Sequence, residues 1–267
     1  MSTAQAHNGS GNARVGLGLL GHSPPRQWPG TAYYFLGVLA RKLIGVQLFR
    51  HRVLHFNNVL CHGDVEGGCG LVFLYEIWVK KTYDVVLPSL SHGPEILFDV
   101  GANCGFFGLR RCLQNLEAQV YCFEPHPRTF GVLQRNVELN GLSGRVRVVQ
   151  CAVGAVSGKC RIEMDATSSM AVLAQGRAPD GKAATTVEVP MVSLDNYCRE
   201  RQVWPDALKI DVEGFEVEVL IGAVECLTRV KRLVLEYHSE ALREKCLKIL
   251  EPGFKTRIIG SLIDAER

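Results

Sequence analysis

The sequence contains, from Ile96 to Gly108, the stretch Ile96-Leu-Phe-Asp-Val-Gly-Ala-Asn-Cys-Gly-Phe-Phe-Gly108. Its apolar start, Ile96–Phe98, is typical of a buried parallel strand. The glycines that follow let the chain turn tightly and approach a ligand closely. A helix is predicted over Phe106–Leu116, and its free N–H groups would point back towards that ligand. Strand, glycine turn and helix together indicate the first unit of a nucleotide-binding α/β fold.

The glycine turn departs from the dinucleotide-binding pattern. That pattern, G-x-G-x-x-G, requires a second glycine where Asn103 stands. The observed pattern is D-x-G-x-x-x-G, with Asp99 two residues before Gly101. An acid at the end of a strand repels a pyrophosphate and attracts an ammonium group. S-adenosylmethionine carries an ammonium and a sulfonium but no phosphate, so the pattern favours this cofactor over NAD.

The composition limits the class of protein. An apolar content of 47% in 267 residues is enough for a large core and excludes disorder of the whole chain. A net charge of +3 without a Lys/Arg-rich block argues against a nucleic-acid partner. We expect no membrane span and no secretory signal. The 10 cysteines show no C-x-x-C pair and no zinc-like spacing, which predicts reduced thiols in a cytoplasmic protein.

The sequence divides into three regions. Residues 1–30 are rich in Gly, Ser, Asn and Pro, which predicts a disordered leader. Residues 31–90 are interpreted as an N-terminal cap over the nucleotide unit, and residues 91–267 as the main domain. Within the cap we predict a helix at Tyr33–Leu48, a strand within Leu48–Val59, a turn or hairpin at Cys61–Gly70 and a second helix at Leu71–Lys81.

Strands and helices alternate from Glu95 onwards, which predicts a mostly parallel sheet with helices on both faces. After the first unit, the predicted strands are Val120–Phe123, Val146–Val153, Leu208–Val212, Leu233–Tyr237, Thr256–Ile259 and Leu262–Ala265. The predicted helices are Thr129–Asn140, Leu194–Glu200, Phe215–Leu227 and Ser239–Leu250. Lys159–Met164 and Thr186–Leu194 are predicted to pair as antiparallel strands, with a mobile loop at Asp165–Lys182 between them.

Acidic residues stand at four of the five predicted parallel-strand ends, where such sheets bind ligands. These strand-end residues are Asp99, Glu124, Asp211 with Glu213, and Glu236 with His238. The spacing from Asp99 to Glu124 is close to the ~20 residues expected for an acid that binds ribose hydroxyls. The third strand instead ends in small side chains, Cys151 and Ala152, against which an adenine could lie flat. Alternative interpretations are helix capping for Glu213 and an internal hydrogen-bond network for Glu236 and His238.

Several motifs together resemble the FkbM-type S-adenosylmethionine-dependent methyltransferases, over about residues 70–260. They are Phe98-Asp-Val-Gly-Ala-Asn-Cys-Gly105, Phe123-Glu-Pro-His-Pro127, Asn136-Val-Glu-Leu-Asn-Gly141, Cys151-Ala-Val-Gly154, Val192-Ser-Leu-Asp195 and Leu208-Lys-Ile-Asp-Val-Glu-Gly-Phe-Glu216. The resemblance implies a Rossmann-like class I methyltransferase fold with seven strands. It also implies methyl transfer to a hydroxyl, often on a sugar or polyketide, although similar enzymes methylate amide nitrogens of peptides.

Strand ends and motifs together predict a cofactor site. Its predicted members are Asp99, Gly101, Ala102, Asn103, Gly105, Glu124, Pro125, Cys151, Ala152 and Asp211. Two functions outside this class remain open, an NAD-dependent Rossmann oxidoreductase and a non-catalytic module that retains the cofactor pocket.

Catalysis is predicted at the last two parallel-strand ends. A protonated alcohol is a poor nucleophile, so a general base or a metal ion should assist. Asp211 and His238 are the candidate bases, with Glu213 beside them and Lys209 orienting the site. A less favoured alternative is a divalent cation held by Asp211, Glu236 and His238, with Glu213 as a further candidate ligand. The expected partner is a small-molecule or peptide acceptor, and a homo-oligomer that completes a short final hairpin is left open.

Overall fold

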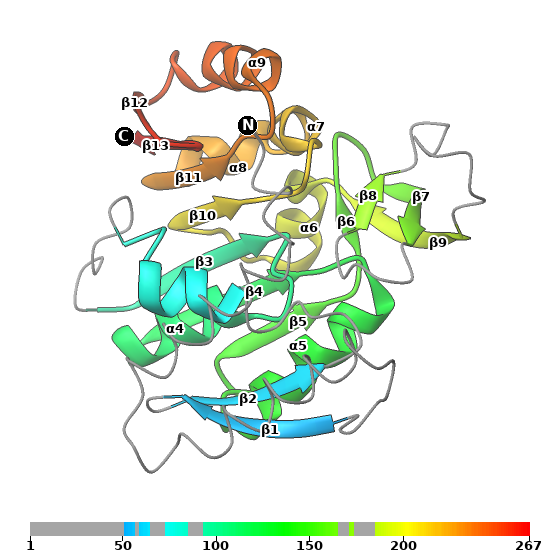
Figure 1. Ribbon diagram of the computed structural model, residues 1–267. Coiled ribbons are helices and arrows are strands. Elements are labelled where there is room, and N and C mark those ends of the chain that lie inside the picture. Colours follow the sequence, from blue (N-terminus) through cyan, green and yellow to red (C-terminus); the bar gives the residue numbers. More distant parts are fainter. Residues whose placement is uncertain (1–50, 57–58, 65–72, 85–92, 165–170, 174–184) are drawn as a thin grey trace.

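The computed structural model describes residues 51–56, 59–64, 73–84, 93–164, 171–173 and 185–267 (Figure 1). A seven-stranded sheet lies at its centre, in the order β12 (Lys255–Ile259), β13 (Leu262–Glu266), β11 (Arg232–Glu236), β10 (Ala207–Ile210), β3 (Glu95–Val100), β4 (Ala118–Phe123) and β5 (Val146–Val149). Six of these strands run in the same direction, and β13 alone is reversed, so it pairs antiparallel with both β11 and β12. The predicted fold class, a mostly parallel seven-stranded sheet, is confirmed.

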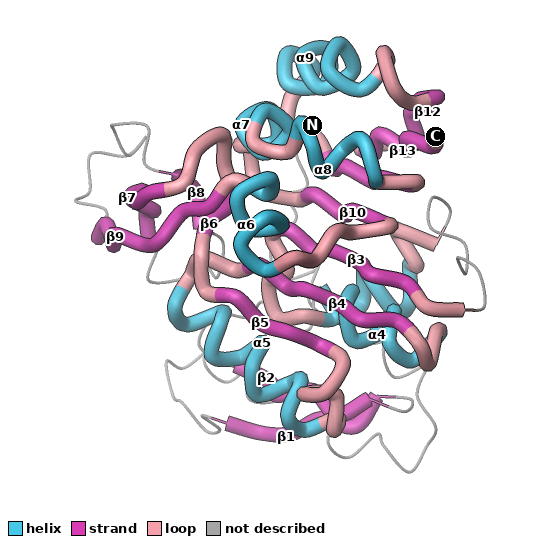
Figure 2. The backbone as a smooth tube through the Cα atoms, turned by 180° about the vertical axis from the view of Figure 1, so that it is seen from behind, coloured by secondary structure: helices cyan, strands magenta, loops and turns pink. Residues whose placement is uncertain are grey.

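Helices cover both faces of the sheet because alternate strand residues face opposite sides. In β3, Leu97 belongs to one hydrophobic cluster and Phe98 to the other. The first face carries the π-helix η3 (Glu76–Lys80), α4 (Phe106–Gln114) and α5 (Pro127–Leu139). The opposite face, turned to the viewer in Figure 2, carries α6 (Leu194–Arg201), α7 (Glu216–Ile221), α8 (Val224–Arg229) and α9 (Glu240–Leu250).

The predicted strand Val146–Val153 is two strands in different sheets. β5 ends at Val149, and β6 (Ala152–Val153) pairs with β9 (Thr185–Val192). The break occurs because the Cys151 N–H donates to the Val149 carbonyl of its own chain segment, at 3.1 Å, instead of to a neighbouring strand. β9 also pairs antiparallel with β7 (Gly158–Met164), as expected. β8 (Ala171–Leu173) then pairs with β7, so this part of the predicted loop is a strand.

The predicted helix Phe215–Leu227 is also interrupted. The chain turns at Gly222, where an added Cβ would lie 2.1 Å from the carbonyl oxygen of Gly154, so the backbones touch. Asp195 then caps the start of α8, accepting hydrogen bonds from the N–H groups of Glu225 at 3.0 Å and Cys226 at 2.8 Å. The tertiary contact therefore explains both the break and the acid of the Val-Ser-Leu-Asp motif.

The final hairpin is longer than the sequence suggested. β12 and β13 pair over five residues each, and β13 pairs with β11 along its whole length. In the described sheet this chain therefore forms both strands of the hairpin itself.

The described part of the cap docks on α5. β1 (His51–Phe56) and β2 (Val59–Asp64) form a hairpin, in which β2 replaces the start of the predicted turn. Asn140 accepts from Leu60 N–H at 2.9 Å and donates to Leu60 O at 2.7 Å. Residues 73–80 are helical, within the predicted second helix. The predicted leader at 1–30 and helix at Tyr33–Leu48 lie outside the described residues.

Asn136 links the cap, α5 and the glycine turn. Its fully buried side chain accepts from His62 N–H at 2.6 Å and donates to Cys104 O at 2.8 Å. We expect Asn136→Ala to lower the free energy of unfolding by about 2–4 kcal/mol, because two buried hydrogen bonds are lost. Urea unfolding measures this, with the exposed Gln134→Ala on the same helix as the control. Equal midpoints for both variants would show that Asn136 does not hold the cap.

No helix in the described ranges is long and apolar enough to cross a bilayer. The described cysteines are all free thiols, and most of them, including Cys122 and Cys151, are buried among apolar side chains.

Candidate active site

The glycine turn lies directly after β3, at the carboxyl end of the sheet. Gly101 and Asn103 both adopt positive φ angles, of 77° and 50°. The N–H groups of Gly101 and Ala102 both donate to Phe123 O at the end of β4, at 3.0 Å each. The turn is therefore held against the neighbouring strand, and α4 begins immediately after Gly105.

Glu124 fastens this turn from the end of β4. Its carboxylate accepts hydrogen bonds from the N–H groups of Asn103 and His126, both at 2.9 Å. The side chain is buried in the wall of the cavity described below, and burial raises its pKa to about 7 in spite of both donors. Glu124 therefore titrates close to neutrality.

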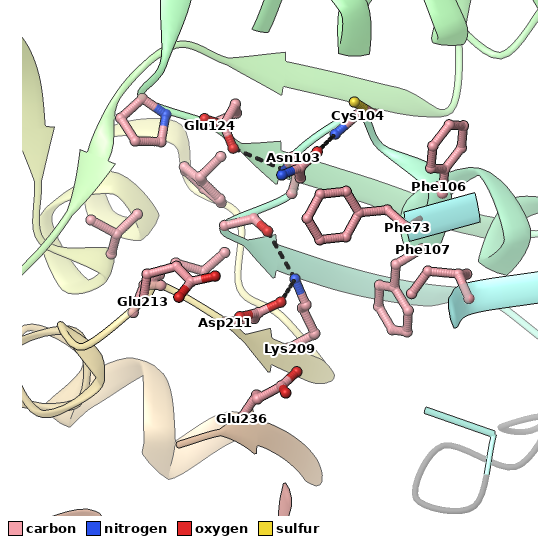
Figure 3. A pocket seen from close by; sticks show the side chains of 18 of the residues that line it. Phe73, Asn103, Cys104, Phe106, Phe107, Glu124, Lys209, Asp211, Glu213 and Glu236 are labelled. Atoms are coloured by element: carbon pink, nitrogen blue, oxygen red, sulfur yellow. Dashed lines mark hydrogen bonds and ion pairs between the residues drawn. The ribbon is translucent and has the colours of Figure 1, made fainter. Parts of the chain in front are cut away.

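A cavity of about 240 Å³ opens beyond the carboxyl ends of β3, β4, β10 and β11 (Figure 3). Most of the predicted site residues line this cavity: Gly101, Ala102, Asn103, Glu124, Pro125, Cys151, Ala152, Lys209, Asp211, Glu213, Glu236 and His238. Five acids line it, against two lysines and one histidine. Phe73, Phe106 and Phe107 supply an apolar side. The cavity therefore suits a ligand with a cationic part and an apolar part.

Asp99 and Gly105 are predicted site residues that do not line this cavity. Asp99 is fully buried, and its Oδ1 lies 3.1 Å from Lys209 Nζ. The two residues are register partners on β3 and β10, so their side chains share one face of the sheet. In this geometry the Asp99 carboxylate therefore pairs with Lys209 and does not line the cavity. Gly105 is instead required by the packing of the turn on α5, since a Cβ there would lie 2.2 Å from the Leu133 side chain.

Lys209 contacts both the glycine turn and the end of β10. Its Nζ donates to Gly101 O at 2.8 Å and lies 3.5 Å from Asp211 Oδ2. Burial lowers the pKa of Lys209, but the charges of Asp99 and Asp211 more than offset this, so its pKa stays above the ordinary value. A charged Lys209 thus ties the glycine turn to the end of β10.

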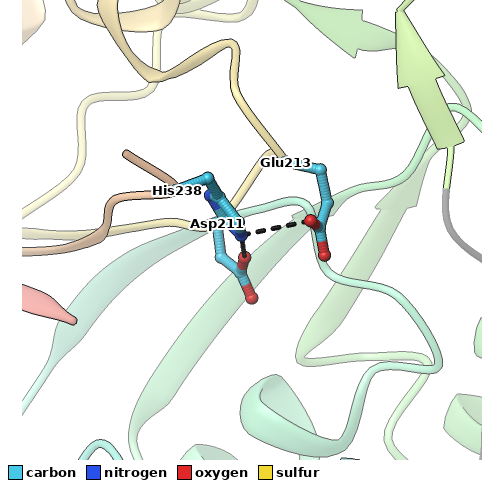
Figure 4. Close-up of side chains that lie close together, drawn as sticks. All are labelled: Asp211, Glu213 and His238. Atoms are coloured by element: carbon cyan, nitrogen blue, oxygen red, sulfur yellow. Dashed lines mark ion pairs between the residues drawn. The ribbon is translucent and has the colours of Figure 1, made fainter. Parts of the chain in front are cut away.

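A carboxylate–imidazole cluster lies at the ends of β10 and β11 (Figure 4). His238 Nε2 is 3.2 Å from Glu213 Oε2 and 3.8 Å from Asp211 Oδ1, while its Nδ1 is 2.6 Å from Glu216 Oε1. Burial alone would lower the pKa of His238, but these carboxylates raise it to about 9. Burial raises the pKa of Glu213 to about 7. His238 is therefore charged at neutral pH, and a carboxylate is better suited than His238 to accept a proton.

The same cluster has the geometry for a cation. One ligand atom each from Asp211, Glu213 and His238 lies within 4.8 Å of the others. Three of the four residues named in the sequence alternative meet here, and Glu236 is not part of the group. Glu236 instead accepts from Ser261 Oγ at 3.1 Å and contacts Tyr83. A cation bound here would take the place of the proton on His238 Nε2, so the site can hold either a proton or a metal ion.

The structure adds residues to the candidate site that the sequence analysis missed. Tyr83 comes from the cap, and its hydroxyl lies 2.9 Å from Glu236 Oε2 and 3.2 Å from Asp211 Oδ2. Glu216, the last residue of a quoted motif, is fully buried against His238. Ile162 reaches the cavity from the second sheet. Only Glu216 had a signal in the sequence, since it stands two residues after Gly214 in the same strand-end motif.

The sheet order with its single reversed strand, and the cavity beyond the carboxyl ends of the parallel strands, define a Rossmann-like α/β protein that binds its ligand at the strand ends. Residues 99–255 match the methyltransferase FkbM domain, and the chain belongs to this family of enzymes.

The chain is similar to several named proteins. The chain is 29% identical to methyltransferase sdnD of Sordaria araneosa, covering 72% of this chain and 80% of that protein. It is 31% identical to the 31-O-demethyl-FK506 methyltransferase FkbM of Streptomyces tacrolimicus, covering 62% of this chain and 74% of that protein. The crystal structure of methyltransferase FkbM from Methylobacillus flagellatus has a TM-score of 0.48 and 16% identity, covering 76% of this chain and 55% of that one.

Proposed function

We propose that the protein transfers the methyl group of S-adenosylmethionine to a hydroxyl of a small molecule, sugar or natural product. The observation that carries this proposal is the single cavity, which joins the glycine turn and Glu124 to the acids after β10 and β11. The family supports methyl transfer. The Streptomyces relative is named for transfer to an oxygen, which favours a hydroxyl acceptor over a peptide nitrogen.

The charges and shape of the cavity fit this donor. Its acidic excess suits a sulfonium and an ammonium group. Glu124 faces the cavity from the end of β4, where a carboxylate can accept hydrogen bonds from ribose hydroxyls. The small side chains of Cys151 and Ala152 leave room on the neighbouring wall for a flat ring. S-adenosylmethionine, when bound, supplies a methyl group already activated by the sulfonium.

The chain must then place an acceptor oxygen and take its proton. Asp211 and Glu213 face the cavity with side chains 22% and 30% exposed, so an acceptor can reach them. As the oxygen–carbon bond forms and the carbon–sulfur bond breaks, the hydroxyl proton passes to Asp211, with Glu213 next to it. His238 Nε2 lies next to both carboxylates, and Lys209 Nζ lies 3.5 Å from Asp211 Oδ2. Positioning of this kind can supply up to ~7–11 kcal/mol of a barrier.

The test is incubation of the purified protein with S-adenosylmethionine and a panel of hydroxylated acceptors, sugars and short peptides. Mass spectrometry should detect the gain of one methyl on an alcohol oxygen. Methyl gain only on peptide nitrogen would establish the alternative. Binding of NAD(H) in preference to S-adenosylmethionine in isothermal titration would contradict the proposed cofactor.

Glu124→Gln tests the ribose contact. Only the ionised carboxylate accepts strongly from two hydroxyls, so binding of S-adenosylhomocysteine should tighten as the pH rises through about 7 in the parental protein. In the variant this pH dependence should disappear, with binding about 10- to 100-fold weaker at higher pH, as for loss of a hydrogen bond to a charged group. Isothermal titration measures both effects, with the exposed Glu117→Gln as the control. A pH dependence that survives in Glu124→Gln would assign it to another group.

A further inference from the structure

The cap places one lysine at the wall of the acidic cavity. Lys80 is the last residue of η3, and its side chain is 55% exposed and lines the cavity. Its Nζ lies 3.8 Å from Glu76 Oε1, a distance longer than a hydrogen bond, and 5.6 Å from the centroid of the Tyr75 ring. Because neither contact occupies a hydrogen of the ammonium group, Lys80 can donate to an anionic group of a ligand.

The other two cationic side chains of the cavity wall are already in use. Lys209 Nζ donates to Gly101 O at 2.8 Å and lies 3.1 Å from Asp99 Oδ1. His238 has a carboxylate oxygen next to each of its two ring nitrogens. Among the described lining residues, Lys80 is therefore the cation best placed to bind an anion from outside the protein.

The N–H groups of the glycine turn are also in use. They donate within the protein, those of Gly101 and Ala102 to Phe123 O, that of Asn103 to Glu124, that of Cys104 to the Asn103 side chain and that of Gly105 to Ala102 O. A carboxylate near this turn therefore finds its donors at Lys80 and at the N-terminus of α4. The first residues of this helix, Phe106 and Phe107, line the cavity, and the N-terminal end of a helix carries a partial positive charge.

The order of the strands indicates which end of the methyl donor meets the cap. S-adenosylmethionine is a linear molecule: adenine, ribose, and then an amino-acid chain that ends in an ammonium and a carboxylate. In the sheet, β4 with Glu124 lies between β5 and β3, and β10 follows β3. With the adenine beyond β5 and the ribose at Glu124, the amino-acid chain extends towards β3 and β10. The cap covers this part of the cavity, since η3 packs on α4 and Tyr83 reaches Asp211 after β10.

We propose that Lys80 binds the carboxylate of the amino-acid end of the methyl donor, so that the cap completes the cofactor site. The proposal rests on the function proposed above, because it takes S-adenosylmethionine as the ligand. Lys80 precedes residues 99–255, which match the family domain, so that match does not assign this contact. A residue of the cap thus binds the charged end of the donor, while the ends of the strands bind its adenosine.

Lys80→Met tests the proposal because it removes the charge and keeps a long unbranched side chain. Binding of S-adenosylhomocysteine should weaken about tenfold, as for loss of a hydrogen bond to a charged group at a partly exposed position. Decarboxylated S-adenosylhomocysteine keeps the adenosine and the amine but lacks the carboxylate, so it should bind the variant and the parental protein with equal affinity. Isothermal titration with the two ligands measures these affinities.

Lys81→Met is the matched control, because it removes the same charge from the next residue, which is exposed and does not line the cavity. It should leave both affinities unchanged, and Lys80→Arg, which keeps the charge, should retain most of the affinity for S-adenosylhomocysteine. Parental affinity for S-adenosylhomocysteine in Lys80→Met would overturn the proposal alone, as would equal weakening for both ligands. A parental protein that binds neither ligand would contradict the proposed cofactor and this contact together.

Discussion

Asp211→Asn should abolish turnover while leaving the protein folded and able to bind the cofactor. The substitution keeps the size of the side chain but removes its negative charge and its ability to accept a proton. General base catalysis contributes typically ~10²–10⁴-fold, so kcat should fall by about that factor. Binding of S-adenosylhomocysteine should change only a few-fold, because Asp211 shares the cavity wall with several other acids. Single-turnover kinetics and isothermal titration measure the two effects separately.

The control for this result is Glu244→Gln, which removes one negative charge from an exposed position on α9. It should have parental kcat, since surface changes away from the site have small effects. Turnover of the Asp211→Asn enzyme at the parental rate would show that Asp211 is not the base, and Glu213 would become the residue to replace next. A large fall in the thermal midpoint of Asp211→Asn would instead assign it a structural role.

Gly101→Ala should disrupt both folding and the cofactor pocket. A Cβ at this position would lie 1.7 Å from the backbone oxygen of Asp211, which cannot move without displacing the end of β10. The φ angle of 77° adds strain for any residue with a side chain. We expect the free energy of unfolding to fall by about 2–6 kcal/mol, combining backbone strain with overpacking. Urea unfolding measures the loss.

The matched control is Gly131→Ala in the middle of α5, where an added Cβ meets nothing within 4 Å. Alanine is favoured over glycine in a helix, so this variant should gain roughly 0.5–1 kcal/mol. Opposite signs for the two substitutions would show that the close approach at Gly101, and not glycine itself, is required. A Gly101→Ala protein as stable as the parent would mean that β3 and β10 separate readily.

Much of the site follows from the order of residues along single strands. In a parallel sheet, the carboxyl ends of neighbouring strands meet at one edge, so Glu124, Asp211 and His238 were expected together and lie together. The glycine turn was predicted from the glycines that follow the first strand, since glycine adopts a positive φ such as that of Gly101 without strain. These predictions succeed because strand direction and backbone conformation are properties of short segments.

The differences from the sequence predictions come from contacts between distant segments. Asp99 was predicted at the cofactor site, and Lys209, more than a hundred residues later, lies beside it in the sheet and pairs with it. The helix after β10 was expected to be continuous, but Gly222 meets the backbone of Gly154 and the chain turns there. The strand from Val146 was expected to reach Val153, but its last residues pair with β9 instead.

The sequence by itself therefore determined the α/β class, the glycine turn and the acidic edge of the sheet, because each depends on local periodicity and strand direction. Only the tertiary structure decided how those acids are held. Tyr83 reaches Asp211 and Glu236 from the cap, and Glu216 is buried against His238. These partners are chosen by the packing of helices and cap on the sheet, and no pattern within one segment specifies which side chains will meet there.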